Sequence, residues 1–217
     1  METGREVEAI STRNGRVAGV ATTAGPLAAD AVVLAAGPWT APLARSAGLE
    51  LPLEPRKGQL VRLEHRPGFF RHKVFDGGYM AAVDSPESAL QVSPVMENTL
   101  DGHVLVGSSR ERVGFDLEVD PLVSEAMLER AAGLAPGLRG LAVHAVWAGL
   151  RPWLPAGLPA LGPSRAAEGL WVATGHEGAG IALGPISGRL VAQAICGETP
   201  DLDLGPFDPD RFARARY

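Results

Sequence analysis

The chain has 217 residues, of which 46% are hydrophobic and 21% are charged, as in an ordinary globular protein. Twenty cationic and 25 acidic side chains give a net charge of −5, and the absence of any Lys/Arg block argues against nucleic acid or an anionic membrane as partner. The apolar runs are too short to span a bilayer, and no signal peptide opens the sequence. The single cysteine, Cys196, excludes an intramolecular disulfide, and no Cys/His cluster has metal-ligand spacing. We therefore expect a cytoplasmic protein with no transmembrane segment and no structural metal, in which Cys196 is a small buried side chain.

The first part of the chain predicts a β-meander, a buried strand and a short helix. Residues 6–12 and 16–23 alternate between apolar and polar, and Asn14-Gly15 between them is typical of a two-residue hairpin turn. Residues 28–36 are apolar on both faces, as expected of a strand buried in a parallel sheet. Residues 40–47 can then form a short helix that ends at Gly48.

The middle of the chain predicts a mostly antiparallel sheet and one longer helix. Short strand candidates separated by turns cover residues 57–64, 79–83, 89–95, 103–108 and 141–150. Residues 120–134 have helical periodicity, with Leu122, Met127, Leu128 and Leu134 as the apolar positions, and Pro136-Gly137 ends the segment.

The last part returns to α/β character. Residues 169–174 predict a buried strand, residues 175–180 a glycine-rich turn, and residues 181–196 a helix closed by Gly197. This order brings backbone N–H groups and a helix N-terminus up to a ligand. The two ends of the chain are therefore expected to share one α/β layer, with the middle forming a second lobe.

A family resemblance rests on motifs that occur in one order over nearly the whole chain. They are VVLAAGPWT (32–40), PRKGQLVRLE (55–64), AGLRPWLPAGLPALGP (148–163) and GLWVATGHEGAGIALGP (169–185). Together they resemble the C-terminal part of the D-amino-acid oxidase / glycine oxidase family of FAD-dependent oxidoreductases. The versions HKVFDGGYMAAV (72–83) and LVGSSRERVGFD (105–116) look closest to dehydrogenase subunits of that family, such as those of hydrogen cyanide synthase, opine oxidase and D-hydroxyproline dehydrogenase.

The resemblance implies a fold class, a domain division and a reaction. The fold is α/β (α+β): a partial FAD-binding Rossmann-like layer with a β-meander, and a mostly antiparallel substrate-binding lobe. Residues 1–54 and 155–217 would form the incomplete FAD-binding lobe, and residues 55–154 the substrate-binding lobe. The reaction would oxidise the C–N bond of an amino or imino acid by hydride transfer to the flavin.

The substrate-binding residues implied by the motifs are Arg151, Tyr79 and Gln91. A guanidinium fork fits an amino-acid carboxylate bidentately, and Arg151 matches the position of the family's carboxylate-binding arginine; the alternative is a structural ion pair. Tyr79 could hydrogen-bond the substrate or only complete the sheet. Gln91 lies near the position of the substrate tyrosine of glycine oxidase, and Gly178 replaces an arginine of that enzyme, so substrate identity cannot be carried over.

The cofactor-binding residues implied by the motifs lie at both ends of the chain. Residues 176–182 resemble the loop that lines the flavin ring, where glycines let the backbone approach closely and the next helix stabilises negative charge on the reduced flavin. His176 is assigned a positioning role and no role as a general base. Gly37 is expected near the FAD, and Val7 at the position whose backbone meets the adenine. The full set is Val7, Gly37, His176, Glu177, Gly178, Ala179, Gly180, Ile181 and Ala182.

One element of the family pattern is missing from this sequence. No Gly-x-Gly-x-x-Gly follows a strand near the N-terminus, and this fingerprint holds the FAD pyrophosphate. The chain could be a truncated product, a fragment, or half of a split enzyme whose protein partner supplies the nucleotide-binding half; a partner that accepts electrons is a further alternative. Alone, it is expected to bind FAD weakly or not at all. The competing functional hypothesis is a non-catalytic remnant that acts as a binding or assembly module.

Overall fold

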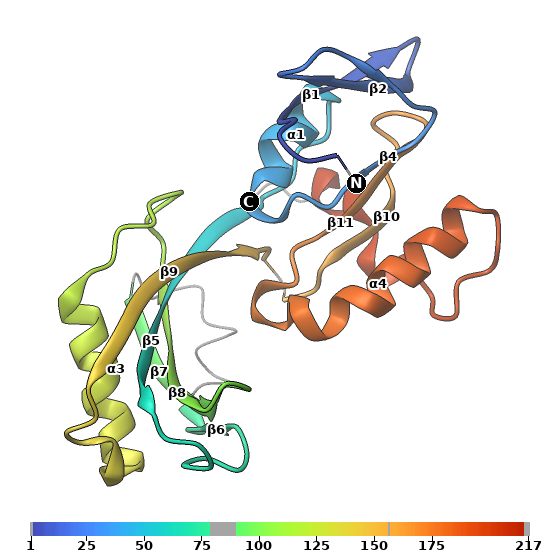
Figure 1. The fold of residues 1–217 in the computed structure, drawn as a ribbon. Helices are drawn as coiled ribbons and strands as arrows, with labels where there is room; N and C mark the ends of the chain where they lie inside the picture. Colours follow the sequence, from blue (N-terminus) through green and yellow to red (C-terminus); the bar gives the residue numbers. More distant parts are fainter. Residues whose placement is uncertain (1, 79–89, 156, 215–217) are drawn as a thin grey trace. The chain divides into compact units, whose positions relative to one another are not determined.

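The computed structural model describes residues 2–78, 90–155 and 157–214. The chain divides into two compact units (Figure 1). The first, which we call the α/β unit, consists of Met1–Glu54 and Pro152–Tyr217. The second, which we call the antiparallel unit, consists of Pro55–Arg151. Both ends of the chain thus belong to one unit, and the observed fold is the mixed α/β class with mostly antiparallel sheets.

The α/β unit opens with the predicted meander. Strands β1 (Val7–Arg13) and β2 (Arg16–Thr22) pair antiparallel around Asn14-Gly15, and β3 (Leu27–Ala28) adds to β2. Asn14 and Gly15 both have positive φ, 52° and 76°, as the two-residue hairpin turn requires.

A second sheet of the α/β unit joins the two ends of the chain. Strand β4 (Val32–Leu34) runs parallel to β11 (Leu170–Thr174), and β10 (Ala160–Pro163), which the sequence did not predict, pairs antiparallel with the other edge of β11. The prediction of a long strand over 28–36 buried on both faces was wrong. Only three residues form β4, which is the terminal strand of this sheet, and Val33 is 41% exposed.

Two helices flank these strands. Helix α1 (Thr40–Ser46) follows a 3₁₀ turn, η1 (Gly37–Trp39), and packs against β1 and β4; the Ile10 N–H donates to Ser46 Oγ at 2.8 Å. Helix α4 (Gly180–Ile195) packs against β10 and β11. The buried positions of α4 are few: Ser187, Leu190 and Val191.

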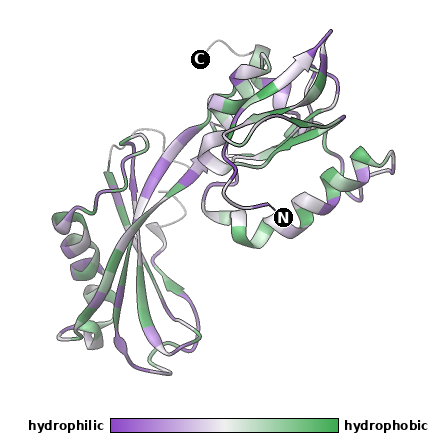
Figure 2. Ribbon diagram, turned by 45° about the horizontal axis from the view of Figure 1, so that its top comes forward, coloured by the Kyte–Doolittle hydropathy of each residue, from purple (hydrophilic) through white to green (hydrophobic). Residues whose placement is uncertain are grey.

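Helix α4 exposes much of its apolar surface, and hydrophobic residues recur along its length (Figure 2). Cys196, its C-terminal cap residue, is also exposed, so the prediction that it is buried was wrong. Gly197 follows with a φ of 75°. The 3₁₀ turns η4 (Gly205–Phe207) and η5 (Pro209–Arg214) complete the unit.

The antiparallel unit is built on one five-stranded sheet of order β6-β7-β8-β5-β9. The strands predicted over 57–64, 89–95, 103–108 and 141–150 are confirmed and are longer than predicted, because their ends pair beyond the apolar runs. The strand predicted over 79–83 lies outside the described residues, and β6 was not predicted. The bounds of the sheet's strands are β5 Glu54–His65, β6 Val74–Phe75, β7 Leu90–Asn98, β8 His103–Glu111 and β9 Val143–Trp153.

Helix α3 (Pro121–Leu134) covers β7 and β8. Asp120 caps it by accepting a hydrogen bond from the Leu122 N–H at 2.9 Å, and Pro121 occupies the first helical position. The buried face carries Val123, Met127 and Ala131, whereas Leu122 is 73% exposed. The predicted helix is confirmed, and two of its predicted apolar positions, Met127 and Leu128, pack against the core, whereas Leu122 and Leu134 are exposed. None of the helices in the described part of the chain is long and apolar enough to cross a membrane.

The core of the antiparallel unit should be sensitive to the loss of Met127, which is fully buried between α3 and the sheet. We expect Met127→Ala to lower the free energy of unfolding by about 2–5 kcal/mol, because lost burial and a cavity add together. The matched control is Leu122→Ala on the same helix, expected to change it by less than about 0.5 kcal/mol. Urea unfolding followed by circular dichroism measures both, and equal effects would contradict this packing of α3.

Candidate functional site

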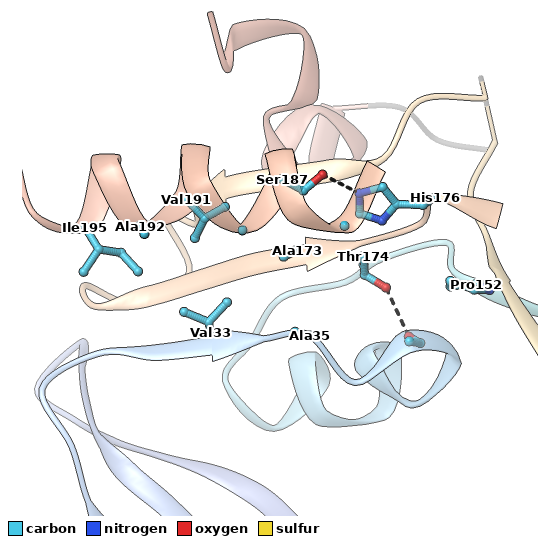
Figure 3. A pocket seen from close by; sticks show the side chains of 13 residues that line it. Val33, Ala35, Pro152, Ala173, Thr174, His176, Ser187, Val191, Ala192 and Ile195 are labelled. Atoms are coloured by element: carbon cyan, nitrogen blue, oxygen red, sulfur yellow. Dashed lines mark hydrogen bonds between the residues drawn. The ribbon is translucent and has the colours of Figure 1, made fainter. Parts of the chain in front are cut away.

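The α/β unit contains a hollow of about 400 Å³ between α4 and the parallel strands. Val33 and Ala35 of the β4 segment form one wall, Ala173 and Thr174 of β11 the floor, and α4 the other wall (Figure 3). The α4 residues recur at one-turn intervals as Gly184, Ser187/Gly188, Val191/Ala192 and Ile195. Two of the predicted cofactor residues, Gly37 and His176, line this hollow.

Polar side chains gather at the end of the hollow nearest the N-terminus of α4. The His176 Nε2 lies 2.8 Å from Ser187 Oγ, and Thr174 Oγ1 donates to the Gly37 carbonyl at 3.1 Å. Burial of the half-buried imidazole lowers the pKa of His176 below its ordinary value of 6.5, so the ring is neutral at pH 7. A neutral imidazole hydrogen-bonded to a hydroxyl can orient a ligand without adding charge.

The predicted flavin loop forms the 3₁₀ turn η3 (Glu177–Ala179) and the first turn of α4. Glu177 has a φ of 50°, in the left-handed region that non-glycine residues rarely adopt. Among the described residues, no side chain caps the N-terminus of α4, and Ile181 is 98% exposed. Within this part of the chain, the positive end of the 16-residue helix therefore has no capping acceptor from a side chain.

A second hollow, of about 550 Å³, is lined by residues on both sides of Gly37 in the sequence. Val7, Ala36 and Trp39 line it, and Trp39 is 52% exposed. Gly37 has a φ of 54°, and a Cβ built there would meet nothing within 4 Å. The structure thus brings Gly37 and His176 to the first hollow and Val7 to the second, whereas the other predicted cofactor residues, 177–182, line neither hollow.

The predicted substrate residues lie in the antiparallel unit. Arg151 is half-buried on β9, and its NH1 donates to the Ser109 carbonyl of β8 at 3.0 Å. Gln91 lies on β7, where its Oε1 accepts a hydrogen bond from Arg56 NH2 at 3.1 Å. Tyr79 lies outside the described residues.

The same sheet contains a buried polar network, formed around Lys57, Gln59 and Glu111, that was not predicted from the sequence. Lys57 Nζ lies 3.5 Å from Glu111 Oε2 and 3.0 Å from Asp116 Oδ2, and the Lys57 side chain is only 4% exposed. Gln59 donates through Nε2 to Glu111 Oε1 at 3.2 Å, and its N–H donates to Ser109 Oγ at 3.0 Å. Burial lowers the pKa of Lys57, but the hydrogen bond to Asp116 and the two carboxylate charges outweigh it, so the net pKa is raised.

Strand alternation could have revealed this network. Lys57 and Gln59 share the parity of Val61 and Leu63, so a face that is apolar further along the strand predicts that these two polar side chains are also buried. Buried polar groups need partners, which Glu111 provides. Among the described residues, no group of His, Cys, Asp or Glu side chains is arranged to hold a metal ion.

The FAD dependent oxidoreductase family model matches residues 1–194. The chain belongs to this family. Its members depend on FAD, and relatives include glycine oxidase from Pseudomonas putida, 40% identical over 196 residues, which make up 90% of this chain and 50% of the relative. The hydrogen cyanide synthase subunit HcnC of Pseudomonas protegens is 33% identical over 96% of this chain and 47% of the relative.

Solved structures agree with the sequence relatives. Glycine oxidase from Geobacillus kaustophilus superimposes with a TM-score of 0.81 at 30% identity, covering 98% of this chain and 52% of that one. Iminodiacetate oxidase from Chelativorans sp. BNC1 gives a TM-score of 0.78 at 29% identity, over 93% of this chain and 52% of that one. The chain therefore spans about half the length of the relatives that it matches.

The neutrality of His176 can be measured directly. We expect its imidazole to titrate below 6.5 in an NMR titration of the ring Cε1–H signal, assigned with a His176→Gln variant. The unfolded chain binds this proton more readily than the folded one, so His176 makes stability fall as the pH drops through 6.5. Ser187→Ala should leave the midpoint low, because burial rather than the hydrogen bond is the cause; a wild-type midpoint at or above 6.5 would contradict this environment.

Proposed function

We propose that this chain forms part of an FAD-dependent oxidoreductase that oxidises the C–N bond of an amino or imino acid. The main support for this proposal is that Gly37 and His176, which are far apart in the sequence, line one hollow beside the N-terminus of α4. The α/β unit would hold the cofactor. The antiparallel unit would bind the substrate through Arg151.

The residues of the α/β unit fit FAD in shape and in charge. Gly37 leaves open space where any other residue would place a Cβ, so an extended ligand can pass close to the backbone there. The first-turn N–H groups of α4 suit partial negative charge, as on the pyrimidine end of a flavin. When bound, FAD supplies the two-electron acceptor for the amine. Val7, bordering the second hollow, would contact the adenine end.

The side chains of the protein would supply binding and orientation. Arg151 would pair with the substrate carboxylate through its guanidinium fork, which fixes the position of the adjacent C–N bond. His176, being neutral and hydrogen-bonded to Ser187, would position a ligand and would not remove a proton from the amine. The substrate class is therefore an amine that carries a carboxylate.

The half of the relatives that this chain does not match would complete the cofactor site. Strand β4 is the terminal strand of its sheet in the described part of the chain, and apolar side chains on it and on α4 lie exposed: Val33, Ile181, Leu183, Ile186 and Ile195. Away from His176, the hollow is lined by small and apolar residues, so this part of it suits packing against protein, and the cofactor would lie at the end that carries Gly37 and His176. A strand and helix from that other half, on the same or on a partner polypeptide, would cover this surface.

The proposed function is tested by supplying that half. The chain is coexpressed with the segment of Pseudomonas putida glycine oxidase that it does not match, and purified through a tag on this chain. We expect a retained flavin absorbance that bleaches anaerobically when glycine, a D-amino acid, a cyclic imino acid or iminodiacetate is added. The chain alone is the control, and retained flavin that no amino or imino acid reduces would overturn the proposal.

The role of Arg151 makes a separate prediction in that assembled protein. Arg151→Ala should reduce kcat/KM by the equivalent of about 2–3 kcal/mol, because a charge-assisted contact to the carboxylate is lost. Arg139→Ala, which removes an exposed arginine of the same unit, is the matched control and should leave kcat/KM unchanged. Unchanged kinetics in Arg151→Ala would remove Arg151 from the substrate site.

A further inference from the structure

The guanidinium of Arg151 lies directly over the backbone of Gly58, a buried residue of the neighbouring strand β5. A Cβ built on Gly58 would stand 2.2 Å from Arg151 NH1, 2.3 Å from NH2 and 2.5 Å from Cζ. These separations are far below van der Waals contact. Any side chain at this position would therefore displace the guanidinium from where it lies.

The backbone does not itself require glycine at this position. The φ of Gly58 lies outside the left-handed region, so an L-residue could adopt the same conformation without strain. Gly149, two residues before Arg151 on β9, also lacks a left-handed φ, but a Cβ there would meet nothing within 4 Å. What distinguishes Gly58 is thus the guanidinium above it.

The Ser109 carbonyl is the second group that supports the guanidinium, and the buried network on the opposite face of β5 fixes its position. Arg151 NH1 donates to the Ser109 carbonyl, and the Ser109 hydroxyl accepts from the Gln59 N–H at 3.0 Å and donates to Glu111 Oε1 at 2.7 Å. The pairing of β5 with β8 is irregular between Lys57 and Leu60, the segment that contains Gly58. Irregularities of this kind re-aim side chains near functional sites.

We propose that Gly58 is a positioning residue: with the Ser109 carbonyl, it forms a seat that holds the planar fork of Arg151 in one orientation for a substrate carboxylate. The seat depends only on the geometry of this chain, whereas its effect on the substrate rests on the proposed function. Because the guanidinium ends a flexible side chain, it gives way before the backbone does. Gly58→Ala therefore displaces the fork and leaves the fold intact.

The seat is tested first without cofactor or activity. The Nε–Hε signal of Arg151, assigned with Arg151→Ala, is recorded by ¹H–¹⁵N NMR in the full chain. We expect the signal to move or broaden in Gly58→Ala and to keep its position in Gly149→Ala. An unchanged signal in Gly58→Ala overturns the seat. Should Gly58→Ala fail to fold, folding restored in Gly58→Ala/Arg151→Ala supports the seat, and failure of the double variant overturns it.

The consequence for substrate is tested in the flavin-loaded, assembled protein. Gly58→Ala should raise KM for the carboxylate-bearing amine about tenfold with kcat changed less, and should add nothing to Arg151→Ala. A normal KM in Gly58→Ala, where Arg151→Ala raises it, overturns the positioning role. A normal KM in Arg151→Ala itself instead refutes the proposed role of Arg151, and the NMR result still decides whether the seat exists.

Discussion

The parallel pairing of β4 with β11 is the constraint on which the α/β unit depends. Three residue pairs, Val32 with Leu170 to Leu34 with Val172, join segments that are more than 130 positions apart in the chain. Parallel strands end at the same edge of a sheet, so the segments after β4 and β11 leave it side by side. For this reason Gly37 and His176 line the same hollow, and the Thr174 hydroxyl stabilises this arrangement by donating a hydrogen bond to the Gly37 carbonyl. Local sequence alone would leave these groups unrelated.

Much of the fold could be predicted because its signals are local. The Asn14-Gly15 turn, the helical periodicity of residues 120–134, and the strand, glycine-rich turn and helix around residue 175 each carry their own pattern. The errors occur where burial depends on distant segments. Residues 28–36 have the composition of a central strand, yet β4 is a terminal strand with Val33 exposed, since no second neighbour pairs with it within the described sheet. The short β10 was missed because its pairing with β11, rather than its own pattern, makes it a strand.

The candidate site divides in the same way. Motifs indicated Gly37, the His176 loop and Arg151, but not the side chains that hold them. No local pattern in the sequence links Ser187 to His176, and only the fold brings the two side chains together. The Lys57–Glu111 pair looks like ordinary surface charge in the sequence, and only the parity shared with Val61 and Leu63 indicates that Lys57 is buried. Motifs therefore indicate the proposed ligand-binding groups better than they indicate the side chains that hold those groups in place.

The antiparallel unit shows why the side chains that orient a predicted binding group matter. A buried ion pair is a weak source of stability, because desolvation of both charges offsets their attraction. The Lys57–Glu111 pair instead contributes to the position of Arg151: Glu111 accepts a hydrogen bond from the Ser109 hydroxyl, and the Ser109 carbonyl accepts one from Arg151. Fixing one carbonyl removes the freedom of a long side chain, whose rotamers would otherwise be restricted only when a substrate binds. The network, the bare backbone at Gly58 and the arginine above it then act as one preorganised unit, in which the orientation of a single guanidinium depends on charges buried on the far side of the strand.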